Sequence, residues 1–424
     1  MHSGQRNTTS RIIAVGIAVL FIVSGCEVHA ELKKSTEKTP ASRIGERHTF
    51  NVARLVLPGE GKNENRSIDL RVGFIYVGTS GDYGFTYAQN RGRLALMEKL
   101  GVQTMVIENV PEDERCMEAM QSLIDNGCKV IFSCGFGFMD YTVKMAEMYP
   151  NLHFFHCAGY ETRPNMSAYF GRMYKVRYMT GIVAGMRTQT NKIGYIASFP
   201  IPEVIRGANV FALGVKSVNP NAKVYIKWSK TWVNHSLERK LALELLDGDC
   251  DVLAQHQDTV SPQIAAQERG AWSIGYNSPM GAFAKDAYLT GAIWNWEPYM
   301  IAQIQKIADG TWKSSNYWGG MEDDIIRLDA LTKNVAPGTQ EAVEEARRRI
   351  INGFDVFEGA IYDNTGKLRV PEGGTMTDEE KLTVDWFVDN ISEVATYHDS
   401  VQKRKYRQAS RFHNELCVCG DNHD

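Results

Sequence analysis

Short apolar runs alternate with amphipathic segments of helical period from residue 69 onward. The apolar runs are hydrophobic on both faces, which is typical of strands in a parallel sheet covered by helices. The first series predicts strands at 70–77, 103–108, 129–133 and 152–156, with helices at 86–100, 114–126 and 141–148 between them. Gly101, Gly127 and Pro150 supply the helix stops.

The same alternation begins again further along the chain. It predicts helices at 172–187, 203–218, 237–246 and 262–269, with strands at 192–197, 223–228, 251–255 and 272–276. Two successive doubly wound units indicate two α/β lobes. Residues 288–388 show only one strand–helix pair and several polar turns, so we expect this part to complete both lobes. The predicted boundaries are 67–170 plus 284–325 for the first lobe, and 171–283 plus 326–395 for the second.

The N-terminal segment has the architecture of an export signal. Arg6 and Arg11 precede an apolar run at 12–23, which is too short to span a bilayer comfortably. The run ends in Val-Ser-Gly-Cys at 23–26, a pattern resembling a bacterial lipobox that would lipidate Cys26. An ordinary cleaved signal with an incidental cysteine is the alternative. No later apolar run predicts a spanning helix, and the polar segment 27–66 is typical of a flexible tether.

Composition narrows the function classes. The chain has 424 residues, of which 43% are hydrophobic and 23% charged, and its formal net charge is −3. This balance is typical of a soluble globular protein and gives no sign of a nucleic-acid partner. Seven cysteines remain after Cys26, an odd number that cannot all pair within the chain. We expect mostly buried free thiols, with a disulfide left open.

Aromatic and polar side chains recur where predicted strands end. Ligands of open α/β sheets bind beyond the carboxyl ends of the strands, whereas turns usually carry small polar residues. Rings beside Asp and Asn suit a flat heterocycle with polar edges, because the rings stack on its faces and the polar groups pair with its rim. The alternative is that the aromatics simply pack between the lobes. The candidate ligand-binding residues are Asp82, Phe85, Phe136, Phe199, Trp228, Asp258, Asn277, Trp294 and Trp296.

Five segments resemble the basic membrane protein family, the substrate-binding lipoproteins of ABC transporters. They lie at 81–87, 169–174, 191–208, 254–259 and 274–277, and the resemblance spans about residues 71–387. The longest of them, NKIGYIASFPIPEVIRGA, is far more specific than a short motif. The resemblance implies a type I periplasmic binding protein fold with two doubly wound lobes and a three-strand hinge. It also implies a small purine-type ligand, a permease and an ATPase as partners, and no cofactor.

The resemblance also implies roles for individual residues. Asp82 and Phe85 correspond to a base-contacting polar residue and a stacking aromatic, and Phe199 to a second stacking aromatic. Asn277 and Trp294 stand where nucleoside-binding members carry an aspartate and a lysine that hold the ribose. Their replacement favours a free base such as adenine. A nucleoside or a flavin-type ligand remains open, as does a sensor role with a membrane partner.

An enzyme is not expected, since the chain has no nucleophile elbow, P-loop, metalloprotease helix or dinucleotide fingerprint. His256 and Asp258 lie close in sequence, but no motif places a nucleophile beside them. The polar tail 396–424 carries His413, Cys417, Cys419 and His423, which could bind zinc or copper. The spacing is not that of a standard finger, so no metal site is predicted. We expect a monomer whose lobes close on hinges near Gly171, 256–258 and 283–288.

Overall fold

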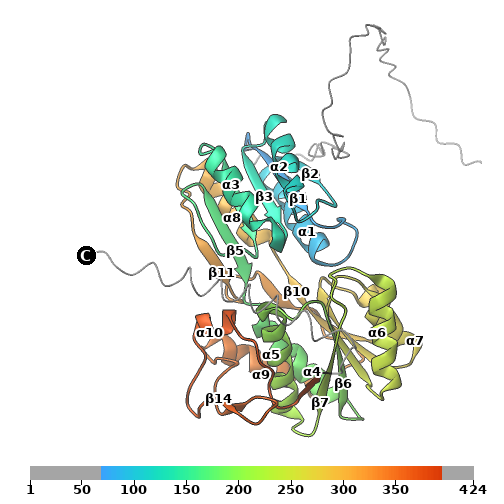
Figure 1. Cartoon of the computed structure of the whole chain (residues 1–424). Helices are drawn as coiled ribbons and strands as arrows, with labels where there is room; N and C mark the ends of the chain where they lie inside the picture. The colour runs from blue at the N-terminus through green and yellow to red at the C-terminus, as the bar shows by residue number, and fades with distance from the viewer. Residues whose placement is uncertain (1–67, 394–424) are drawn as a thin grey trace, which may run out of the picture. The chain divides into compact units, whose positions relative to one another are not determined.

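The computed structural model describes residues 68–393, which form two parallel-sheet lobes (Figure 1). The first sheet has the order β11-β5-β4-β3-β1-β2, and its strands pair in parallel throughout. Its strands are β1 (Arg71–Tyr76), β2 (Gln103–Ile107), β3 (Val130–Cys134), β4 (His153–Cys157), β5 (Met166–Gly171) and β11 (Asn316–Gly319).

Helices cover both faces of the first sheet. On one face α1 (Phe85–Leu100) packs with α8 (Glu297–Ala308), and on the other lie α2 (Arg115–Asp125) and α3 (Met139–Met148), the last preceded by the short turn η1 (Phe136–Phe138). Successive residues of β1 serve opposite faces, so Phe74 joins the core under α1 while Ile75 joins the core under α2 and α3. The apolar runs are therefore buried on both sides, as the sequence pattern predicts.

The second sheet has the order β12-β10-β9-β8-β6-β7-β15 and is parallel except for the β10–β12 pair. On one face α6 (His235–Asp247) packs with α7 (Ser261–Glu268), and on the other α4 (Tyr174–Arg187) packs with α5 (Pro202–Val218). Its strands are β6 (Lys192–Ala197), β7 (Lys223–Trp228), β8 (Val252–His256), β9 (Trp272–Asn277), β10 (Tyr288–Trp294), β12 (Ile326–Leu328) and β15 (Ile391–Glu393).

Glycines let α4 and α5 approach each other closely. A Cβ atom placed on Gly181 would lie 2.1 Å from the Phe211 carbonyl oxygen, and one on Gly214 would lie 2.0 Å from that of Tyr178. The two helices therefore meet backbone to backbone, and side chains larger than hydrogen at these positions would force them apart. Smaller elements complete this lobe: η2 (Gly281–Phe283), α9 (Thr339–Ile351), the hairpin β13 (Ile361–Tyr362) and β14 (Leu368–Val370), and α10 (Asp378–Leu382).

The predicted α/β class with two doubly wound parallel sheets is confirmed, and the strands at 192–197 and 223–228 match at both ends. The region 288–388 holds more structure than predicted, because β11, β12, β13 and β14 have only two to four residues each and carry too weak a pattern to detect. The later strands and helices there, such as β12 and α9, belong to the second lobe.

One predicted boundary is wrong. Residues 284–325 were assigned to the first lobe, yet β10 pairs with β9 and so belongs to the second sheet. An apolar strand buried on both faces can join either sheet, and nothing local decides between them. Within residues 68–393 the chain passes between the sheets three times, after β5, after β10 and after β11. The hinge expected at 256–258 is not a crossing, since β8 leads into α7 of the same lobe.

Several predictions concern residues outside the described range of 68–393. They are the signal segment with Cys26, the tether 27–66 and the Cys/His tail. Within that range no helix is both long and apolar enough to cross a membrane. The prediction of buried free thiols is confirmed for the five cysteines that the structure describes, namely Cys116, Cys128, Cys134, Cys157 and Cys250.

Candidate functional site

The loop after β1 touches the loops after β8 and β9, so the two lobes meet where their strands end. A Cβ atom on Gly84 would lie 2.4 Å from the Asp258 carbonyl oxygen, so only glycine fits against this residue. Ser278 donates a hydrogen bond from Oγ to the Tyr83 carbonyl oxygen at 2.5 Å. The Tyr83 ring stands edge-on to Phe283, with centroids 4.6 Å apart. These contacts bring the candidate residues of both lobes together.

Hydrogen bonds to the Asp82 carboxylate join its own loop to the start of α1. Its Oδ1 accepts hydrogen bonds from the backbone N–H groups of Gly84 at 2.7 Å and Tyr87 at 2.9 Å. The first N–H groups of a helix have no partner within the helix, so this carboxylate satisfies donors that would otherwise be orphaned. Burial raises the pKa of Asp82 above its usual value despite these bonds. In this structure the carboxyl has a local structural role.

Asp258, Asn277 and Trp294 form a chain of buried hydrogen bonds. The Trp294 indole Nε1–H donates to Asn277 Oδ1 at 3.0 Å, and Asn277 Nδ2 donates to Asp258 Oδ1 at 2.7 Å. An indole N–H can only donate, so the amide must turn its oxygen to Trp294 and its NH₂ to the carboxyl. Asn277 has a left-handed φ of +69°, a conformation that asparagine tolerates better than most residues. The chain fixes the direction in which Asp258 points.

Carboxyl groups surround Asp258. Burial, and next the charge of Asp82, hold the pKa of Asp258 well above its usual range, and Glu238 adds to the effect. Burial likewise raises the pKa of Glu238 to about 7. Glu238 accepts from the Asn234 backbone N–H at 2.8 Å and from the Thr259 hydroxyl at 2.5 Å. The meeting point of the lobes is therefore rich in acceptor groups.

An aromatic wall lines the second-lobe side of this region. The ring centroids of Phe199 and Trp232 lie 5.5 Å apart, and those of Trp232 and His256 lie 6.4 Å apart. The Asp258 backbone N–H donates to the Trp232 carbonyl oxygen at 3.1 Å. Trp232 is thus the tryptophan after β7 that joins the site, whereas the sequence analysis selected Trp228. Trp228 is the last residue of β7 and Trp232 lies in the loop that follows, and no local signal separates them.

His256 packs against Trp232 and is itself held by neighbouring side chains. Its Nε2 lies 3.0 Å from Glu203 Oε2, and its ring stands edge-on to Tyr276. Burial, together with the nearby Arg177, lowers the pKa of His256 to about 4, so the imidazole is neutral at pH 7. Arg177 lies with its guanidinium carbon 4.0 Å from the centre of the Tyr276 ring. Sequence reasoning missed Glu203 and Arg177, since charged residues inside helices usually signal surface.

The remaining candidates lie in three different settings. Trp296 is 1% exposed and stacks on Trp294 at 4.6 Å, which holds the indole of Trp294 in place. Trp228 is buried, and its Nε1–H donates to Oε1 of Glu393 in β15 at 3.1 Å. Phe136 is 55% exposed at the start of η1. The structure therefore joins Asp258, Asn277, Trp294 and Trp296 through direct contacts. Asp82 is linked to them through Gly84, Phe85 is the next residue in the chain, and Phe199 is reached through Trp232.

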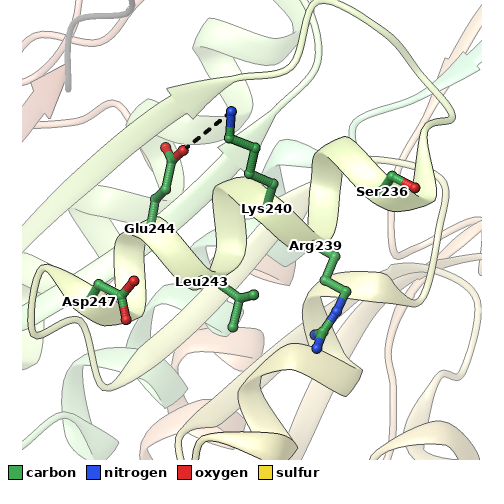
Figure 2. Close-up of a pocket in the computed structure, with 6 residues that line it drawn as sticks. All are labelled: Ser236, Arg239, Lys240, Leu243, Glu244 and Asp247. Atoms are coloured by element: carbon green, nitrogen blue, oxygen red, sulfur yellow. Dashed lines mark ion pairs between the residues drawn. The ribbon is translucent and has the colours of Figure 1, made fainter.

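Two surface hollows lie elsewhere. Figure 2 shows one of about 400 Å³ on the outer side of α6, lined by this single helix and crossed by the Lys240–Glu244 ion pair. The other, of about 630 Å³, lies between the β12 region and α9. Neither includes a predicted ligand-binding residue. Within residues 68–393, no group of three or more His, Cys, Asp or Glu side chains could hold a metal ion.

Comparison with solved structures shows the same fold. A solute-binding protein of an ABC transporter from Conexibacter woesei gives a TM-score of 0.58 at 20% identity, covering 67% of this chain and 97% of that one. A solute-binding protein from Aeropyrum pernix gives a TM-score of 0.59 at 18% identity, covering 67% and 92%. The two-lobed parallel architecture is that of type I periplasmic binding proteins.

Sequence comparison shows the family. Residues 70–359 match the model described as ABC transporter substrate-binding protein PnrA-like. A purine-binding protein of Brucella abortus is 36% identical, covering 81% of this chain and 97% of the relative. A putative ABC transporter glucose-binding protein of Haloferax volcanii is 33% identical, covering 85% and 92%.

These relatives are binding proteins and not enzymes, in agreement with the absence of catalytic motifs from the sequence. A protein of this kind has a small-molecule ligand and works with the permease and ATPase of a transporter. The chain belongs to the PnrA-like family of ABC-transporter substrate-binding proteins, the basic membrane protein family that its sequence resembles.

Proposed function

We propose that this protein captures a purine-type ligand, with a free base such as adenine favoured, for an ABC importer. The relative from Brucella abortus that is named as purine-binding supports the purine class. The aromatic and acceptor-rich surroundings of Asp258 support a flat heterocycle that offers hydrogen-bond donors.

The bond between Trp294 and Asn277 is the observation that carries the preference for a free base. By the family resemblance, these two residues correspond to the positions that hold the ribose in nucleoside-binding members. Here the two side chains bond to each other at 3.0 Å, and Trp294 is further held by its stack on Trp296. Moving the indole to admit a sugar would break a buried hydrogen bond and leave the Asn277 carbonyl oxygen unpaired, which is costly.

Binding follows from lobe closure. Phe85 at the start of α1 and Phe199 after β6 belong to different lobes, so a ring can stack on both only when the lobes come together. A ligand favours the state that offers it more contacts, and closure is thereby selected. Anchoring by lipid at Cys26, export and a monomeric state complete the proposal.

Other ligands compete with this assignment. A nucleoside or a flavin-type ring would also stack on Phe85 and Phe199, and the Haloferax relative is named as a putative glucose-binding protein. A sensor that signals to a membrane partner would use the same closure.

Thermal unfolding of the purified full-length chain tests the proposal. The melting temperature is measured with free purine bases, nucleosides, riboflavin and glucose, because a ligand that binds only the folded state raises it. A rise with adenine and none with glucose or riboflavin is expected. A rise with glucose or riboflavin alone would reject the purine class.

A further inference from the structure

Asp258 stands where the two lobes touch. Its side chain is 6% exposed, and its charge is opposed by the carboxyls of Asp82 and Glu238. The carboxyl accepts a hydrogen bond from the amide of Asn277 at 2.7 Å. Each carboxyl oxygen has two lone pairs, so the bond from Asn277 leaves the group with acceptor capacity for a further donor.

The carboxyl of the neighbouring Asp82 already accepts hydrogen bonds within its own loop. Its Oδ1 accepts from two backbone N–H groups of its own loop. Asp258 is instead held by a side-chain relay from Asn277 and Trp294, and its backbone lies against Gly84 of the first lobe. Of the two carboxyls, Asp258 is the one oriented by side chains from neighbouring strands of its own lobe.

A free purine base differs from its nucleoside in one relevant group. The imidazole ring of the free base carries an N–H, and the glycosidic bond of a nucleoside removes that donor. A buried acceptor left without its donor costs binding free energy, so a site built around one rejects the analogue that lacks it.

We infer that Asp258 is a specificity-determining residue of this site, whose carboxyl accepts a hydrogen bond from the imidazole N–H of a free purine base. The inference rests on the proposed function and adds to it the atom by which free bases are distinguished from N9-substituted purines. Asn277 and Trp294 act as positioning residues for Asp258, since their hydrogen bonds fix the direction of its carboxyl.

The experiment measures the affinities of adenine and 9-methyladenine for the purified full-length chain by isothermal titration calorimetry. The two compounds differ only by the methyl group that replaces the N–H. We expect the wild type to bind adenine at least about tenfold more tightly, which is the cost of leaving one buried acceptor without a donor. In Asp258→Asn the ratio should shrink toward one, whereas the surface control Asp286→Asn should keep the wild-type ratio.

The Asp258→Asn variant separates the hydrogen bond from simple exclusion of a methyl group. If a steric clash with another residue excluded the methyl group, the ratio of adenine affinity to 9-methyladenine affinity would be the same in Asp258→Asn as in the wild type. That result would overturn the inference. Equal affinities in the wild type would also overturn it while leaving purine capture intact. Failure of both compounds to bind would reject the proposed function itself.

Trp294→Phe tests the positioning role. The change keeps an aromatic ring but removes the N–H that orients the Asn277 amide. We expect the adenine to 9-methyladenine ratio to fall in this variant, with both affinities still measurable. An unchanged ratio would show that Asp258 is held without the relay.

Discussion

Two carboxyl groups meet at the contact between the lobes, and they are held in opposite ways. Asp82 is bonded by backbone N–H groups two and five residues away in its own loop. Asp258 is bonded by a side chain 19 residues away, which is fixed in turn by Trp294 on another strand. The first arrangement survives lobe opening because it lies within one lobe. The close contact of the Asp258 backbone with Gly84 crosses between the lobes, so lobe opening can change it.

The difference indicates a division of labour. The hydrogen bonds of Asp82 within its own loop fix the first turn of α1. The hydrogen bonds from side chains to Asp258 instead fix the direction of its carboxyl, with little backbone involvement. The predictions below alter one part of this arrangement at a time.

The largest effect is expected from Trp294→Ala. The change removes a nearly buried ring that stacks on Trp296 and leaves Asn277 Oδ1 unpaired. Loss of a buried tryptophan side chain lowers the free energy of unfolding by about 3–5 kcal/mol. Urea unfolding followed by tryptophan fluorescence and circular dichroism measures it. Trp294→Phe is the matched control and should cost less, and a loss under about 1 kcal/mol in Trp294→Ala would contradict the packing role.

Glu238→Gln should change the pH dependence of stability. The folded-state pKa is raised from 4.5 to about 7, so the folded protein holds this proton more tightly than the unfolded chain. The stability contributed by Glu238 is therefore full below pH 4.5 and is lost as the pH rises through about 7.

Glutamine resembles the protonated acid and can still pair with Asn234 and Thr259. Relative to the wild type, Glu238→Gln should gain stability between pH 4.5 and 7, on the order of 3 kcal/mol at 1.36 kcal/mol per pKa unit. Thermal unfolding at a series of pH values measures this difference. Parallel curves for the two proteins would show that Glu238 does not titrate in this window.

Gly84→Ala should weaken ligand binding without unfolding either lobe. A methyl group at this position would stand 2.4 Å from the Asp258 carbonyl oxygen, so the lobes could not close fully. Affinity for adenine should fall at least about tenfold, or 1.4 kcal/mol. Gly81→Ala is the matched control from the same loop, since a Cβ there meets nothing within 4 Å. Equal affinities in the two variants would mean that binding does not need this contact.

The smallest effect is expected from Asp82→Ala, which removes the hydrogen bonds that join the loop to the start of α1. Loss of a carboxyl that caps the start of a helix costs about 1 kcal/mol. Asp82→Asn keeps an acceptor for the N–H groups of Gly84 and Tyr87 and should cost less. The melting temperatures of the two variants report the difference. If Asp82→Asn were the more damaging change, charge rather than capping would be the role of this residue.

Features that depend on residues nearby in the sequence could be predicted, whereas features that depend on distant residues could not. Helix α1 and its end at Gly101, which has a left-handed φ of 65°, are readable from local pattern and turn chemistry. The pairing of β10 with β9 and the choice of Trp232 over Trp228 depend on partners far along the chain. Local pattern carries no information about such partners.

The candidate site divides likewise. The rule that ligands lie beyond strand ends predicts Asp258, Asn277 and Trp294 for the site, and these three side chains are neighbours in space. It could not show that the Asp82 carboxyl is bonded within its own loop. Nor could it reveal Arg177 and Glu203, which lie in helices and reach the site through His256.

The central claim is that a free purine base is the ligand. Titration of the purified full-length chain with adenine and with adenosine, at pH 7 and by calorimetry, tests it most directly. The account predicts saturable binding of one adenine per chain, with adenosine bound at least about tenfold more weakly. Adenosine bound as tightly as adenine would contradict it, because the bonded pair of Asn277 and Trp294 would then leave room for a ribose.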